Sequence, residues 1–231
     1  MLFRRYLLEL RRKRLLQKAT DPVVKEFLSH PIPDGNLDYR QLPLMAIDLE
    51  TTGLDPRKAE MLSVGFAPIY DGRVQLSQAE HLLISPERGV GDESATIHGI
   101  LDDHADEHGS PLAEVLPKVL KRLAGHVLVA HHAPIEYNFL SYACRKVYGI
   151  KPVIPFIDTL VLEKQILDRR SHTFEPGALR LFTSRNRYNL PRYAAHDALS
   201  DAIACGELFL AQADYQAGHD GKLPFKRLLN R

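Results

Sequence analysis

Short apolar runs, each of strand length, recur along the middle of the chain. Runs of this kind predict buried strands, here at 44–48, 126–130 and 152–157. Residues 61–84 predict two further strands that turn at Asp71-Gly72, because Asp-Gly between apolar segments is typical of a type I′ hairpin. Together these segments predict a five-stranded sheet.

Amphipathic segments separate the later strands and predict helices. Apolar residues recur at helical spacing at 110–125, 133–148, 159–170, 176–188 and 198–213. Pro117 lies inside the first of these segments and is expected to strain or kink it. Asp158 and Asp197 directly precede two others, where we expect their carboxylates to cap the helices.

The order of the elements indicates the fold class. Antiparallel strands come first and are followed by strands that alternate with helices, which predicts an α/β protein with a mixed sheet flanked by helices. We expect residues 1–43 to form a basic helical extension and a linker, residues 44–215 one domain, and residues 216–231 a C-terminal tail.

Composition narrows the class of protein. Of 231 residues, 45% are hydrophobic and 26% charged, as is typical of a soluble globular protein. Cys144 and Cys205 provide neither a disulfide framework nor zinc-ligand spacing, which favours a reducing, cytoplasmic location. No apolar run is long enough for a membrane span, and charges interrupt every candidate signal segment.

The net charge of +1 conceals an asymmetry. Residues 1–18 contain seven basic residues and one acid, so the rest of the chain has a net charge of −5. Phe3, Leu7 and Leu10 form one helical stripe, and we interpret the segment as a helix that packs on the domain and exposes its charges. Nucleic-acid contact, a protein partner and membrane-surface association are the alternatives. Glu9 and the lack of serine disfavour an organellar presequence.

Two carboxylates follow the first apolar run. Asp48 and Glu50 are two residues apart on a strand, so their side chains leave the same face with roots about 7 Å apart. Adjacent buried carboxylates repel unless a cation or a proton lies between them. The alternative is that the strand has already frayed here and both acids meet solvent.

A third acid lies in the last predicted helix. Asp201 is off the polar stripe of that helix, among apolar neighbours, and His196 precedes it by five residues. A site made of three carboxylates would favour Mg²⁺ or Mn²⁺ over zinc, because these ions prefer oxygen ligands. Two such ions about 4 Å apart suit phosphoryl transfer. His126, His131 and His132 show no spacing to a fourth zinc ligand, so we interpret them as structural or substrate-side groups.

A family resemblance appears when the motifs are taken in order. The chain has Asp48-x-Glu50-Thr-Thr-Gly, then "IHGI" at 97–100, "VLVAHHAPIEYNFL" at 127–140, "FIDTL" at 156–160, and His196 followed by Asp201-Ala202. This series resembles the DnaQ-like 3′–5′ exonucleases of the DEDDh type, a family that includes the proofreading epsilon subunit of bacterial DNA polymerase III. The resemblance covers about residues 44–212 and implies a ribonuclease-H-like fold.

The resemblance also implies a role for each matching residue. Two ions, Mg²⁺ or Mn²⁺, would be held by the four acids Asp48, Glu50, Glu136 and Asp201. His196 would be the general base that deprotonates the attacking water. The terminal nucleotide would contact Thr51, Thr52, Leu54 and His98. Each residue also has an alternative role: turn formation for the two threonines, an ordinary loop position for Leu54, and helix capping or packing for His98. Asp158 is expected to anchor its helix.

Glu136 departs from the family pattern. The second motif usually reads His-Asn-x-x-Phe-Asp, whereas aligned on His131 this chain has His132 for the Asn, Ile135 for the Phe and Glu136 for the Asp. The extra methylene leaves three alternatives: a working site with a shifted backbone, a slow enzyme, or a protein that binds metal or nucleic acid with little turnover.

The persistence of the other motif residues favours an active enzyme. The resemblance then predicts a metal-dependent 3′–5′ exonuclease that releases 5′-mononucleotides from single-stranded 3′ ends. DNA is the favoured substrate, although nothing in the sequence separates DNA from RNA. The alternative is an accessory or nucleic-acid-binding subunit that retains the fold but has little activity.

Overall fold

The sheet is seven-stranded in the computed structural model, which describes residues 2–87, 109–169, 175–193, 197–218 and 221–229. The strand order is β5-β4-β2-β1-β6-β7, and β3 pairs with β2. The strands are β1 (Leu44–Thr51), β2 (Met61–Tyr70), β3 (Arg73–Val74), β4 (Glu80–Ser85), β5 (Ser110–Pro111), β6 (Val127–Ala130) and β7 (Phe156–Asp158). The five predicted strands are present, with the second strand of the predicted hairpin divided into β3 and β4, and the two-residue strand β5 was not predicted.

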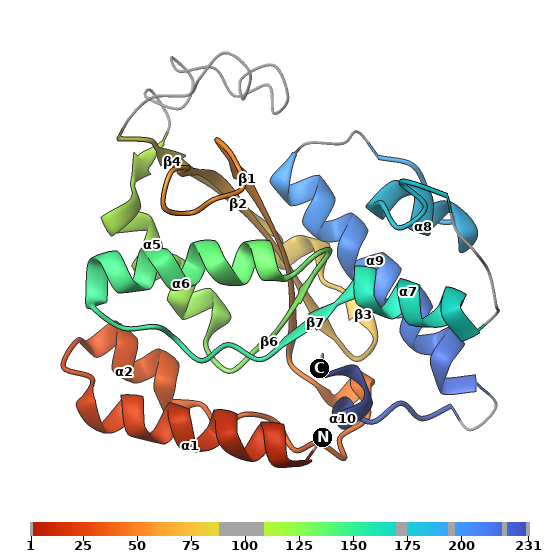
Figure 1. Cartoon of the computed structure of the whole chain (residues 1–231), viewed down its shortest axis with the longest axis horizontal. Helices are drawn as coiled ribbons and strands as arrows, with labels where there is room; N and C mark the ends of the chain where they lie inside the picture. The colour runs from red at the N-terminus through yellow and green to blue at the C-terminus, as the bar shows by residue number, and fades with distance from the viewer. Residues whose placement is uncertain (1, 88–108, 170–174, 194–196, 219–220, 230–231) are drawn as a thin grey trace.

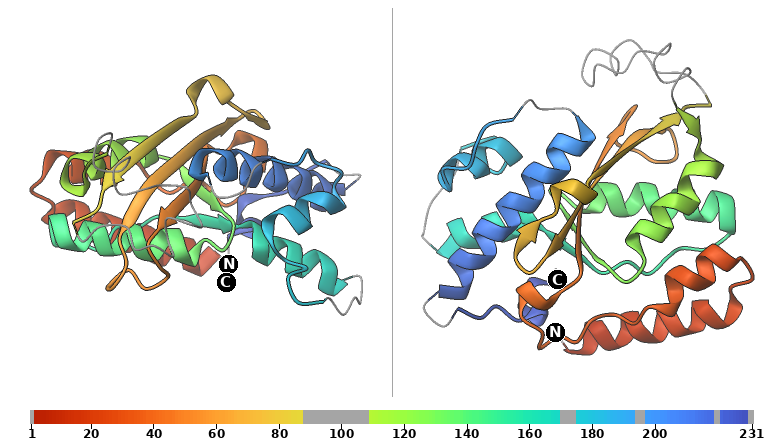
Figure 2. Two further views of the ribbon diagram at one scale, coloured as in Figure 1. Left: turned by 90° about the horizontal axis from the view of Figure 1, so that it is seen from above. Right: turned by 180° about the vertical axis from the view of Figure 1, so that it is seen from behind.

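Helices cover both faces of the sheet (Figures 1 and 2). They are α1 (Leu2–Lys18), α2 (Pro22–Ser29), α5 (Leu112–Leu123), α6 (Pro134–Tyr148), α7 (Thr159–Arg169), α8 (Leu181–Arg187), α9 (Ala198–Ala217) and α10 (Phe225–Leu228). Short 3₁₀ turns lie at Tyr39–Gln41 and Leu76–Gln78. The described helices lack the combination of length and apolar character that crossing a membrane requires.

Strand β1 is the centre of this arrangement. It pairs antiparallel with β2 and parallel with β6, so the predicted mixed sheet is confirmed. Met45 and Ile47 point into the core beneath α5 and α6, whereas Leu44 and Ala46 point into a second core beneath α9. By the same alternation, Asp48 and Glu50 lie on the face of β1 that is turned to α9.

Several predicted elements differ in length from the sequence interpretation. The turn at Asp71-Gly72 has the positive φ angles of a type I′ hairpin, 51° and 69°, but its second strand breaks after two residues. The predicted strand 152–157 becomes β7 only from Phe156, because the prolines at 152 and 155 have no N–H to donate. The predicted helix 176–188 begins at Leu181. Pro117 is accommodated inside α5.

The N-terminal helix packs on the domain, as predicted, but with a different face. Leu8 and Leu15 contact the cores, whereas Leu7, which the predicted stripe included, is 47% exposed. Part of its basic charge is structural, because buried Arg12 binds Glu9 and donates to the carbonyl oxygen of Leu28. The sequence interpretation missed α2, although Asp21 before Pro22 is a helix-start signal and its carboxylate accepts from two N–H groups of that helix.

Gly65 of β2 determines how closely α9 approaches the sheet. It lies opposite Asp48 in the β1–β2 register. A Cβ atom at this position would lie 2.1 Å from the carbonyl oxygen of Ala198, the first residue of α9. Glycine therefore permits the start of α9 to rest on β2 beside Asp48.

We predict that Gly65→Ala lowers the free energy of unfolding by roughly 1–3 kcal/mol, because the new methyl must displace backbone. Gly53→Ala is the matched control, since its Cβ would meet its nearest neighbour at an ordinary 3.4 Å. Urea denaturation of both variants measures the difference. Equal stability of the two would contradict the proposed close packing.

Candidate active site

The C-terminal half of β1 supplies the first two acids of the site. Asp48 is partly exposed, and Glu50 is 4% exposed. Ile47 and Leu49, which alternate with them, are buried in the core on the other face. The strand therefore has not frayed at this point, and the alternative in which both acids meet bulk solvent is wrong.

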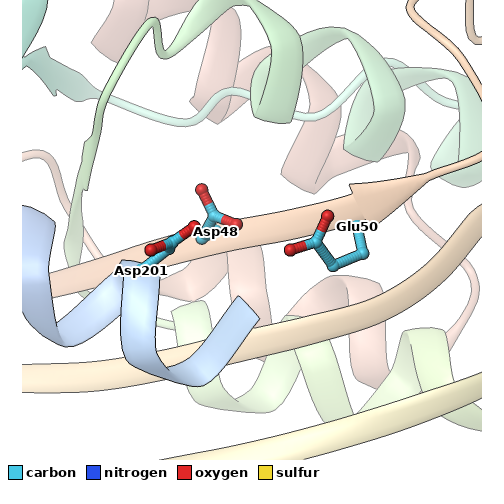
Figure 3. Close-up of side chains that lie close together, drawn as sticks. All are labelled: Asp48, Glu50 and Asp201. Atoms are coloured by element: carbon cyan, nitrogen blue, oxygen red, sulfur yellow. The ribbon is translucent and has the colours of Figure 1, made fainter. Parts of the chain in front are cut away.

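Helix α9 supplies the third acid. Asp201 lies in its first turn and is 9% exposed. The predicted cap is confirmed, because the Asp197 carboxylate accepts from the N–H of Ser200 at 2.8 Å. Asp48, Glu50 and Asp201 each place a carboxylate oxygen within 4.8 Å of the others, as Figure 3 shows.

Glu136 lies beside this group rather than within it. It occupies the first turn of α6 and is 4% exposed. Its charge acts on Asp48, since among the neighbouring carboxylates it has the largest effect in raising the pKa of that residue. Its Oε2 atom is buried and has no hydrogen-bond partner among the residues that the structure describes. A buried acid oxygen without a donor is costly unless a proton or a cation accompanies it.

Burial and neighbouring charges raise the pKa values of three of these acids. Burial, then Glu136, Glu50 and Asp201, raise the pKa of Asp48 well above its usual value. Burial and the charge of Asp201 raise the pKa of Glu50 to about 7. Burial, and to a lesser extent the charge of Asp158, raise the pKa of Glu136 to about 8.

This set of donors fits a hard divalent cation. All the convergent ligand atoms are carboxylate oxygens, which Mg²⁺ and Mn²⁺ prefer. The orphaned oxygen of Glu136 is a further acceptor beside the group. Asp48, Glu50 and Asp201, with Glu136 next to them, are therefore the residues able to hold such ions.

The predicted substrate-binding residues Thr51, Thr52 and Leu54 lie in or next to the turn after β1. Thr51 donates its hydroxyl to the carbonyl oxygen of Gly53, and Thr52 accepts from the N–H of Glu60, so both build the turn after β1. Leu54, in the same turn, is 79% exposed and free to meet a ligand. His98 and His196 lie outside the described residues.

Hydrogen bonds of His131 and His132 connect the loop before α6 to the start of α7. The His131 ring binds Thr159 Oγ1 and the carbonyl oxygen of Leu179, both at 2.8 Å, and is therefore structural. Asp158 caps α7, as predicted, and also accepts from the N–H of His132, whose φ is 73°.

An open hollow borders the site on one side. Its volume is about 900 Å³, and His132, Phe182 and Asp201 are among the residues that line it. Sequence reasoning did not find it, because it forms between the loop before α6, helix α7, residues 175–183 and the start of α9, and no motif links these segments.

Comparisons with known proteins identify the family. The profile of the Exonuclease family (RNase_T) matches residues 45–209. This chain belongs to that exonuclease family. It is an RNase T/DnaQ-like exonuclease domain, so the family resemblance of its motifs is confirmed. Members of the family typically depend on divalent metal ions.

Individual relatives give the scale of the similarity. A PolC-type DNA polymerase III of Thermotoga maritima is 35% identical over 195 residues, 84% of this chain but 13% of that protein. The DNA polymerase III epsilon subunit of Rickettsia prowazekii is 27% identical over 171 residues, 71% of each chain. The chain thus spans only a small part of the PolC-type relatives.

Solved structures confirm the fold. Exonuclease X, in complex with 5′ overhanging duplex DNA, superposes with a TM-score of 0.56 at 20% identity, over 76% of this chain and 93% of that one. E. coli Exonuclease I, in complex with a dT13 oligonucleotide, gives 0.62 at 15% identity, over 75% of this chain and 41% of that one.

The raised pKa values predict how metal-free stability depends on pH. Because the folded protein holds protons that the unfolded chain releases near pH 4.5, stability falls as pH rises through the interval up to about 7 for Glu50 and about 8 for Glu136. In EDTA we therefore expect Tm to be a few degrees higher at pH 5.5 than at pH 8. Mn²⁺ should raise Tm more at pH 8, where it no longer competes with protons.

Thermal unfolding of Glu136→Gln checks the assignment. Its neutral amide should flatten the pH dependence, whereas Glu26→Gln, at an exposed position on α2, should leave it as in the wild type. A Mn²⁺-induced shift of equal size at both pH values would refute the idea that protons and cations compete for these acids.

Proposed function

We propose that this chain is a divalent-cation-dependent 3′–5′ exonuclease that releases 5′-mononucleotides from single-stranded nucleic acid, preferably DNA. The observation that carries the proposal is the cluster of Asp48, Glu50 and Asp201, with Glu136 beside Asp48, at the end of the central strand. The family assignment supports the reaction class. The names of the relatives, DNA polymerase III of two kinds, support DNA.

The four acids would hold two ions, Mg²⁺ or Mn²⁺, and orient them. When bound, the ions would supply Lewis-acid stabilisation of the charge that develops on the transferred phosphoryl group. Because the acids come from β1, α6 and α9, their spacing is set by the packing of three elements. In this proposal His196, close to Asp201 in sequence, takes the proton from the attacking water.

The surroundings of the acids offer room for the end of the strand. The turn formed by Thr51 and Thr52, with exposed Leu54, lies directly after β1, and we propose that it meets the terminal nucleotide, together with His98. The hollow lined by His132 and Asp201 adjoins the acid that α9 supplies. The buried thiols of Cys144 and Cys205 fit the proposed cytoplasmic location.

A second candidate function rests on Glu136. A glutamate reaches further than the aspartate usual in the family, and a misplaced ligand lowers turnover without preventing binding. The protein would then be an accessory subunit that binds nucleic acid and turns it over slowly.

A labelled-strand assay tests the proposal. We expect 5′-labelled dT20 with Mg²⁺ or Mn²⁺ to shorten stepwise from its 3′ end, and EDTA to stop the reaction. Asp201→Asn should lower kcat by about a hundredfold or more, because a charged donor is lost where phosphoryl charge develops. Asp214→Asn is the matched control, since Asp214 is on the same helix but is exposed and pairs with Arg40.

The Glu136→Asp variant separates the two candidate functions. A rise in rate would show that the natural glutamate slows an otherwise competent site, whereas a fall would show that the site is built around glutamate. If the wild type binds dT20 but leaves DNA and RNA strands intact with either metal, the exonuclease proposal is wrong and the accessory function stands.

A further inference from the structure

A second hollow, of about 280 Å³, lies on the solvent side of α6. It forms between the β1–β2 loop, α6 and the connection from α6 to β7; in Figure 1 the loop is above α6 and the connection is below it. Its lining includes Arg57, Asn138, Ser141, Tyr142, Arg145 and Lys151. None of these residues belongs to the acidic cluster.

Positive charge dominates this hollow. Three cations line it against one carboxylate, Asp55, which binds Arg57 at 3.0 Å. Arg145 is exposed, and the Lys151 ammonium lies 5.1 Å from the centre of the Tyr137 ring, a contact that leaves its charge intact. Two positive charges therefore remain available to an anion.

A buried hydroxyl group independently indicates a ligand. Ser141 is 6% exposed, it lines the hollow, and its Oγ atom has no hydrogen-bond partner within the described part of the chain. Buried hydroxyl groups in folded proteins are normally paired. A phosphate oxygen that entered between Arg145 and Lys151 would provide the missing acceptor.

An aromatic side chain completes the set. Tyr142 is 40% exposed, and it lies three residues before Arg145 on the same face of α6. Cationic grooves with exposed aromatic rings are the usual platform for single-stranded nucleic acid, because bases stack on the rings while the cations follow the backbone. Arg11 of the basic helix α1 extends the surface, since its guanidinium donates to the carbonyl oxygen of Lys151 at 3.3 Å.

We infer that this surface binds the phosphate backbone of a single-stranded nucleic acid, on the 5′ side of the 3′ end that the acidic cluster would cleave. The inference rests on the proposed function. Helix α6 links the two places: Glu136 in its first turn acts on Asp48, and Arg145 lies nine residues further along, about 14 Å by helical rise. Nine residues are about two and a half turns, so the two side chains leave opposite faces of α6, and the span corresponds to at least about four stacked nucleotides.

Substrate length is therefore the discriminating variable. For the double variant Arg145→Ala/Lys151→Ala we expect the KM for dT20 to rise about tenfold, while the KM for the dinucleotide dTpdT changes less than twofold because it does not reach the surface. The slope of log KM against log salt should fall by about 1.4, which is about 0.7 for each cation that no longer neutralises a phosphate. Tyr142→Ala should also raise the KM for dT20, and Tyr142→Phe should restore it.

The double variant Lys25→Ala/Lys118→Ala is the matched control. It removes the same charge from exposed positions on α2 and α5, outside this surface. If the two double variants have the same KM and the same salt dependence for dT20, the inference is wrong.

A binding measurement keeps this result separate from the proposed function. Fluorescence anisotropy of 5′-fluorescein-dT20 with the full chain in EDTA reports affinity without turnover. If the wild type hydrolyses nothing, the exonuclease proposal fails, and tenfold weaker binding by Arg145→Ala/Lys151→Ala alone still supports the surface. Unchanged binding by that variant overturns it.

Discussion

Carboxylates that repel one another are held together at the end of β1 by the packing of the surrounding elements. Asp48, Glu50 and Asp201 each place a carboxylate oxygen within 4.8 Å of the others, and the charge of Glu136 raises the pKa of Asp48 further. Like charges repel several times more strongly in a poorly solvated space than at a surface. Without support from the fold, these acids would therefore move apart. They remain together because they are attached to three different elements that the two cores fix.

Buried hydrogen bonds between α7, α8 and α9 show how the position of Asp201 is maintained. Glu163, 1% exposed, accepts from Arg187, Tyr188 and Gln212, and so joins α7, α8 and α9. Arg185, equally buried, donates to the carbonyl oxygen of Ala204 in α9. Buried ionic networks of this kind contribute little net stability, because desolvation offsets their attraction. Removal of one partner is nevertheless costly, so they restrict how α9, and with it Asp201, can move.

The sequence was sufficient for those parts of the site that depend on local periodicity. The two-residue period of a strand places Asp48 and Glu50 on one face, and the helical period separates Asp201 from its polar stripe. Glu136 could be assigned only through the family resemblance, because its burial depends on how α6 meets the end of β6. The stripe that included Leu7 was wrong for a related reason: several faces of α1 carry leucine, and only tertiary packing selects Leu8 and Leu15. The hollow beside Ser141 was not predictable, since it joins segments about 90 residues apart.

A cluster of acids creates a second difficulty, because the substrate of an exonuclease is itself a polyanion. Outside its first 18 residues the chain has a net charge of −5, so attraction cannot come from overall charge. The basic helix contributes less than its composition suggests, since Arg12 is buried and its charge is paired with Glu9. Cations placed across α6, away from the acids, would hold the strand without neutralising the site that holds the metal. In such an arrangement affinity and turnover are set by different residues, and a change at the second-motif acid alters kcat while the hold on the strand persists. A glutamate at position 136 is therefore compatible with tight substrate binding whatever its effect on the rate.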